Sequence, residues 1–202
     1  NFAVAGYAFR QFAKTAERKV FRFQPDVVLM AALAGDNDVT MNVISSVVAD
    51  GTVLDPAFDS VLKREGITRK PTIVEIKRDM GRSNVIAAMR ALSYRRIADL
   101  SRANGAIPVF MYVPRLESED YPPGYDEMVR DARAAGMVVF DLRGVYAGLA
   151  REELMFYRDN VHPNARGHKL IADRLYAELV ARAGEVGLAA SGGSGTVSNP
   201  RK

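Results

Sequence analysis

Four short, continuous apolar runs are the feature that most constrains the fold of this chain. They are Phe2–Ala5, Val27–Ala34, Ile107–Val113 and Met137–Phe140. Apolar residues follow one another in these runs instead of alternating with polar ones, which is typical of strands in a parallel sheet covered on both faces. We therefore expect four strands of such a sheet.

Amphipathic segments lie between and after these runs. They predict helices over Phe9–Phe23, Val85–Asn104, Tyr125–Ala135 and Asn164–Ala183. Ser83 or Asn84 is a candidate cap for the second helix, while Gly105 and Gly136 follow the ends of the second and third. Strands that alternate with helices indicate an α/β three-layer sandwich.

The 202 residues suit one principal domain, which we place at residues 1–183. Residues 42–82 contain several turn signals and are too long for a structureless loop, so we expect an insertion there, a small subdomain or lid. Residues 184–202 are rich in Gly and Ser and are predicted to be a flexible tail.

Composition excludes several classes of function. The 28 basic residues are interleaved with 24 acidic ones, for a net charge of +4, so we expect no nucleic-acid partner. The absence of cysteine excludes a thiol nucleophile, a zinc–thiolate site and a disulfide scaffold. The longest apolar run, Val27–Ala34, is too short to span a membrane. Neither the compartment nor the oligomeric state is predicted.

Candidate site residues follow the apolar runs, because ligands of open parallel sheets bind at the carboxyl ends of the strands. Gly6 follows the first run, and Gly35-Asp36-Asn37-Asp38 follows the second. The Asn37 amide is a candidate donor to a developing oxyanion, with Gly35 allowing a sharp turn. The alternative is an ordinary turn, in which Gly, Asp and Asn are common.

A second candidate block, Asp159-Asn160-Val161-His162, precedes the last predicted helix. An Asp three residues before a His on a turn can fold back and hold the imidazole in one tautomer, as a general base requires. The alternative is an exposed turn that only starts a helix, with Asn164 as its cap. His168 is the other histidine, and we interpret it as a residue on the helix surface.

These blocks, in this order, resemble the SGNH hydrolases, also called GDSL esterases and lipases. The strand that ends in Gly6, the Gly-x-Asn-Asp block from Gly35 to Asp38, and the Asp-x-x-His block at Asp159 and His162 match the motifs of that family. The stretch from Asp159 to Ala172 is similar to its final block and helix. The resemblance spans residues 1 to about 183.

The resemblance implies a parallel flavodoxin-like sheet and a serine ester hydrolase that works through an acyl-enzyme. It implies that His162 is the base, that Asp159 orients it, and that the Gly6 N–H and Asn37 hold the oxyanion, with Gly35 and Asp38 in support. The substrate would be a small-molecule or carbohydrate ester, and neither a metal nor a cofactor would be needed.

The chain departs from the family at its start, because it contains no Gly-Asp-Ser, the block with the nucleophilic serine. It begins with Asn1 directly in an apolar segment. We therefore expect that the natural beginning, with the serine and the first strand, is missing and that this chain alone is inactive. Gly81-Arg82-Ser83 lies after the Gly-x-Asn-Asp block, which is the wrong order, so Ser83 is better interpreted as a helix cap.

Three alternatives to this interpretation draw on the same residues or on the missing serine. An O-acyltransferase acting on polysaccharide would use the same motifs, and a non-catalytic binding module would lack the serine naturally. A metal site would draw on the oxygen and nitrogen ligands Asp36, Asp38, Asp159, His162 and His168. Asp36-x-Asp38 resembles the start of a calcium loop, but Met41 and Val47 replace its glycine and glutamate, so we expect solvated carboxylates instead.

Overall fold

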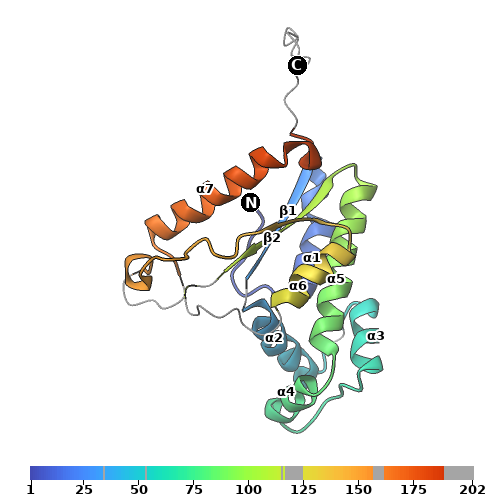
Figure 1. Cartoon of the computed structure of the whole chain (residues 1–202). Helices are drawn as coiled ribbons and strands as arrows, with labels where there is room; N and C mark the ends of the chain where they lie inside the picture. Colours follow the sequence, from blue (N-terminus) through green and yellow to red (C-terminus); the bar gives the residue numbers. More distant parts are fainter. Residues whose placement is uncertain (34, 53, 115, 117–124, 157–161, 189–202) are drawn as a thin grey trace.

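The computed structural model describes residues 1–188 except 34, 53, 115, 117–124 and 157–161 (Figure 1). Helices alternate with strands along most of the chain. The elements are α1 (Phe9–Arg18), η1 (Val20–Phe23), β1 (Val27–Leu33), α2 (Asp36–Asp50), α3 (Pro56–Arg64), α4 (Ile73–Gly81), α5 (Val85–Ala103), β2 (Ile107–Val113), α6 (Tyr125–Ala134), β3 (Val138–Asp141), η2 (Arg151–Glu153), α7 (Ala165–Ala181) and η3 (Ala183–Val186).

The described strands form a parallel sheet in the order β1-β2-β3. Val27 pairs with Ile107 at one end of the β1–β2 ladder and Leu33 with Val113 at the other, so both strands end at the same edge. β2 has the predicted bounds, and β1 covers the predicted strand from Val27 to Leu33, while residue 34 lies outside the described residues. β3 begins and ends one residue later than predicted.

Alternate side chains of the strands point to opposite faces of the sheet. Phe110 and Tyr112 belong to a core shared with α1, α5 and α6, whereas Val109 and Met111 pack on the side of α7. Figure 1 shows α7 apart from the group formed by α1, α5 and α6. The predicted α/β three-layer sandwich is confirmed.

The strand predicted at Phe2–Ala5 is absent. Residues 1–4 have no regular structure and lead into a turn in which Tyr7 N donates to Val4 O, at 3.3 Å. Phe2 instead lies against Phe23, with 5.4 Å between the ring centroids. A short apolar run becomes a strand only when a neighbouring strand accepts its backbone hydrogen bonds, and β1 has no second strand partner among the described residues.

All four predicted helices occur, each with a difference at an end; the fourth, predicted over 164–183, is observed as α7 over Ala165–Ala181. Phe9–Phe23 divides into α1 and the 3₁₀ turn η1, because the α-helix ends at Arg18. The second and third helices each end one residue earlier than predicted, and Gly105 and Gly136 follow with positive φ, as expected of glycines at helix ends. Asn164 caps α7, since its Oδ1 accepts from the backbone N–H groups of Arg166 and Gly167.

Residues 42–82 contain the second half of α2, then α3 and α4. Asp55 caps α3 at Ala57 N, and Thr72 and Glu75 form a capping box at α4. Beyond residue 183 the chain continues as η3, where Val186 is buried against the α7 side of the sheet, so the packed part extends further than predicted. Residues 189–202 of the predicted tail lie outside the described residues. No helix in the described part has the length and apolarity needed to cross a membrane.

Candidate functional site

Asn37 lies where β1 passes into α2, in the first turn of the helix. Asn37 therefore lies at the carboxyl edge of the sheet, where ligands of open parallel sheets bind. Gly35 precedes α2 with φ −80° and ψ −4°, which other residues adopt readily. The chain does turn from strand into helix at this point, but the turn does not require a glycine, and the supporting role of Gly35 stays a prediction.

Asp36, the neighbour of Asn37, is a buried carboxyl group. Its residue is 7 % exposed, and its Oδ2 accepts from Leu33 N at 3.0 Å. Burial raises the pKa of Asp36 from 3.8 to about 6, against the opposing effect of the bond from Leu33. Asp36 thus closes the strand-to-helix turn from inside, and Asp38 is exposed.

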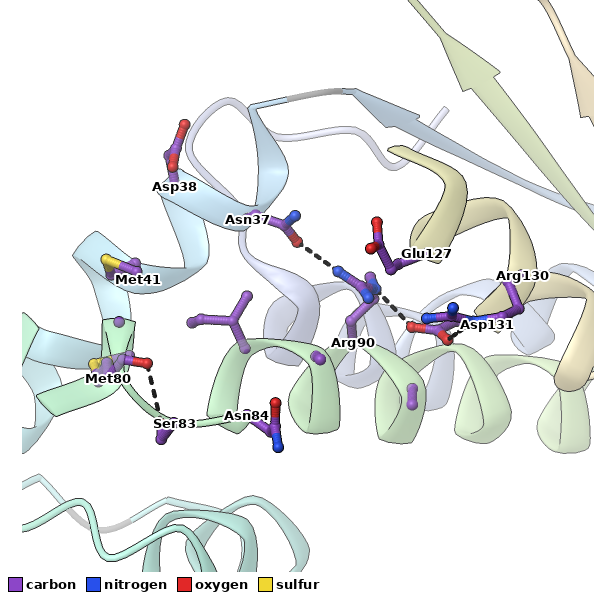
Figure 2. A pocket seen from close by; sticks show the side chains of 14 residues that line it. Asn37, Asp38, Met41, Met80, Ser83, Asn84, Arg90, Glu127, Arg130 and Asp131 are labelled. Carbon is purple, nitrogen blue, oxygen red and sulfur yellow. Dashed lines mark hydrogen bonds and ion pairs between the residues drawn. The ribbon is translucent and has the colours of Figure 1, made fainter. Parts of the chain in front are cut away.

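A hollow of about 820 Å³ opens beside Asn37 (Figure 2). Its walls come from α2, from the junction of α4 and α5, and from α6, so segments far apart in sequence meet there. The lining includes Asn37, Asp38, Met41, Met80, Gly81, Ser83, Asn84, Ile86, Ala87, Arg90, Ala91, Glu127, Arg130 and Asp131. Its volume falls in the range of small-molecule sites, and the lining mixes apolar and charged side chains.

Arg90 connects Asn37 to α6. Its Nη1 donates to Asn37 Oδ1 at 3.1 Å, and its Nε donates to Asp131 Oδ2 at 2.8 Å. Neither Arg90 nor Asp131 belongs to a recognisable motif. The available signal is a charged residue beside a buried apolar one in each helix: Arg90 follows Met89 in α5, and Asp131 precedes Ala132 in α6.

Ser83 also lines this hollow, and its hydroxyl is engaged in the backbone. Its Oγ donates to Met80 O at 3.0 Å and accepts from Val85 N at 3.3 Å. The side chain thus connects the end of α4 to the start of α5, as expected for a helix cap.

The segment before α7 places His162 on the surface of the molecule. His162 O accepts from Phe156 N at 3.0 Å, and Asn164 Nδ2 donates to the carbonyl oxygens of Glu153 and Met155. This network fixes the backbone that enters α7. Asp159 lies outside the described residues, and His168 is exposed within α7.

Gly6 lies in the turn before α1 with φ +76°, a conformation that favours glycine. The start of α1 is connected to α2, because Phe9 N donates to Thr40 Oγ1 at 3.3 Å. The turn with Gly6 thus leads directly into α1, whose first residue is hydrogen-bonded to α2, the helix with Asn37.

The structure brings Asn37 and Asp38 into one hollow and places Gly6 and His162 outside its lining. That Gly6, Asn37 and His162 act on one substrate stays a prediction. Within the described part of the chain, no three His, Asp or Glu side chains lie close enough together to hold a metal ion.

Comparison with protein families identifies the relatives of this chain. The profile of the GDSL-like lipase/acylhydrolase family matches residues 1–175. The chain therefore belongs to this family, as the three sequence blocks predicted. No curated protein and no solved structure matches it.

Proposed function

We propose that this member of the GDSL family belongs to a serine ester hydrolase, for which it provides the base and two oxyanion donors. The nucleophilic serine is contributed by residues outside this chain. The observation that supports this best is the placement of Asn37, whose amide stands beside an open hollow at the carboxyl edge of a parallel sheet. Family membership supports the ester as substrate class.

The reaction runs through an acyl-enzyme. The serine Oγ attacks the ester carbonyl carbon, and His162 takes the hydroxyl proton while Asp159 accepts a hydrogen bond from its other ring nitrogen. The carbonyl oxygen becomes an oxyanion that accepts from Asn37 Nδ2, the Gly6 N–H and the serine N–H. The alcohol then leaves with the proton from His162. Water attacks the acyl-enzyme, gives a proton to His162, and the acid leaves as the serine regains its proton.

The outer edge of β1 supports a contribution from outside this chain. Among the described residues no strand pairs with that edge, and Leu29 and Leu33 on the α7 side of β1 are 44 % and 47 % exposed. Native sheets rarely leave an apolar edge strand open. We propose that a strand leading to the serine pairs with β1 and that the chain following it covers these leucines.

The insertion at 42–82 supports a pocket for a small-molecule or carbohydrate ester. Met80 and Gly81 at the end of α4 form part of one wall of the hollow beside Asn37. We propose that this segment covers the site and shapes the room for the substrate.

The experiment compares this 202-residue chain with the gene product extended upstream through a Gly-Asp-Ser. We expect turnover of a short-chain p-nitrophenyl ester by the extended protein, loss of turnover when that serine is replaced by Ala, and no turnover by the chain alone. Turnover by the chain alone that Ser83→Ala abolishes would show that the nucleophile is assigned wrongly.

Three substitutions in the extended protein test the assigned roles. Asn37→Ala should lower kcat about 10²- to 10³-fold, the usual loss for one oxyanion donor. His162→Ala should lower it further, and His168→Ala, on the exposed surface of α7, is the matched control with a much smaller effect. If His168→Ala is the most damaging of the three, the base is the other histidine.

A further inference from the structure

We propose that Arg90 and Asp131 form a positioning pair that fixes the orientation of the Asn37 amide, so that Nδ2 faces the reacting oxyanion. This inference rests on the proposed role of Asn37 and adds two residues from other helices. Neither residue touches the substrate in this proposal, so both are positioning residues.

An asparagine is useful as an oxyanion donor in only one of its two amide orientations. Its side chain has a donor on Nδ2 and an acceptor on Oδ1, and rotation about the last torsion exchanges them. With Oδ1 turned toward the substrate, the amide would repel an oxyanion instead of stabilising it. A site built on Asn37 therefore needs a partner that distinguishes the two ends of the amide.

Arg90 provides that distinction. Its Nη1 lies 3.1 Å from Asn37 Oδ1. A guanidinium has donors and no acceptor, so it can bind the carbonyl end of the amide and never the NH₂ end. Figure 2 shows the oxygen of Asn37 turned toward Arg90 and the nitrogen on the other side of the amide. The bond thus leaves Nδ2 available to a ligand.

Arg90 is itself held firmly. Its side chain is 3 % exposed, and its Nε lies 2.8 Å from Asp131 Oδ2, whose side chain is 16 % exposed. A buried cation is stable only with a partner of opposite charge, and the planar guanidinium can bind two partners in fixed directions at once. Asp131 therefore balances the charge and sets the angle from which Arg90 reaches Asn37.

The test must distinguish orientation of the Asn37 amide from a purely structural contact between α5 and α6. The mobility of the amide in the ¹⁵N-labelled 202-residue chain, measured by NMR, makes this distinction and does not require an active enzyme. The side-chain amide signal of Asn37 is assigned by its loss in Asn37→Ala. Two other asparagines serve as references: Asn164, whose amide is bonded at both ends, and Asn84, which is exposed.

We expect Arg90→Met to lower the order parameter of the Asn37 amide from near that of Asn164 to near that of Asn84. Arg130→Met is the matched control, since Arg130 is 70 % exposed and lies 3.8 Å from the same Asp131. It should leave the Asn37 signal unchanged. An Asn37 amide that stays rigid in folded Arg90→Met would overturn the proposal.

Arg90→Lys keeps the proposal testable if Arg90→Met does not fold. A lysine ammonium lacks the fork of arginine and should pair with the Asp131 carboxylate in preference to a neutral amide. The charge would then stay balanced while the bond to Asn37 is lost. We expect the same loss of order at Asn37, and an unchanged order parameter would again contradict the role.

A kinetic cycle in the extended protein distinguishes failure of the pair from failure of the proposed function. Arg90→Met should lower kcat about 100-fold with KM nearly unchanged, the scale expected for a misplaced catalytic group. In an Asn37→Ala background the same substitution should have little further effect, because both changes remove one donor. If the double variant loses kcat by the product of the two single losses, the two residues act independently and the proposal is overturned. If Arg90→Met makes the Asn37 amide mobile but leaves kcat unchanged, Arg90 does orient the amide, and the oxyanion role of Asn37 is refuted.

Discussion

Asp36 is the residue whose burial has the clearest consequence for stability. Its pKa is raised from 3.8 to about 6, so the folded chain binds its proton more tightly than the unfolded chain does. The contribution of this group to the free energy of unfolding is therefore fully present below pH 3.8 and is lost as the pH rises through about 6. A shift of this size corresponds to about 3 kcal/mol.

We predict that Asp36→Asn raises the free energy of unfolding at pH 7 by up to about 3 kcal/mol and changes it much less at pH 4. The amide oxygen can still accept from Leu33 N, as the carboxylate does. Urea denaturation at a series of pH values measures this. Asp38→Asn, in the same first turn of α2 but exposed, is the control and should change the free energy of unfolding at pH 7 much less than Asp36→Asn does. A variant less stable than the parent at pH 7 would contradict the prediction.

At the residue scale, sequence patterns located one part of the candidate site and missed another. Asn37 was predicted because it belongs to a local block at a strand end. Arg90 lies 53 positions away, and only the packing of α5 against α2 and α6 brings it to Asn37. Such a contact has no local signal, because it depends on how three helices pack.

At the element scale, the strands β1 and β2 were the easiest elements to predict. β1 and β2 are covered by helices on at least part of each face, and their continuous apolar runs reflect that. The run at Phe2–Ala5 has the same composition and forms no strand. Whether such a run pairs depends on a neighbouring strand, which a local pattern cannot provide.

The start of α7 depends on a close approach at Gly167. A Cβ on this residue would lie 2.6 Å from Pro163 Cβ and 3.2 Å from Leu154 O. We predict that Gly167→Ala lowers the free energy of unfolding by about 1–3 kcal/mol, because the segment that contains His162 must shift to admit the methyl group. Urea denaturation of the 202-residue chain measures this.

Gly81→Ala is the matched control for Gly167→Ala. Gly81 is also helical, at the end of α4, and a Cβ there would meet nothing within 4 Å. Its replacement should leave stability unchanged or raise it by up to about 1 kcal/mol, since alanine favours the helix. Equal effects of the two substitutions would show that the approach at Gly167 is not restrictive.

At the scale of the whole molecule, the sheet is covered unevenly. One face lies under α1, α5 and α6, while α7 covers the other face mainly over β2 and β3. Leu29 and Leu33 therefore remain partly exposed on the side where β1 has no strand partner in the described chain. If a strand and its covering segment complete this side, as proposed, the environment of Leu29 must differ between the 202-residue chain and the extended protein.

We predict that Leu29→Lys destabilises the extended protein much more than the 202-residue chain. In the 202-residue chain, where Leu29 is 44 % exposed, the lysine can reach water, and the free energy of unfolding should change by less than about 1 kcal/mol. In the extended protein the same side chain would be buried, so the substitution should cost more than about 3 kcal/mol. Leu188→Lys is the control for placing a lysine at an exposed leucine, because Leu188, after η3, is 56 % exposed and the change should be tolerated in both forms. Urea denaturation measures the free energy of unfolding of both variants in both forms, each relative to its unsubstituted parent. Equal tolerance of Leu29→Lys in both forms would show that nothing covers this face and that the serine reaches the site by another route.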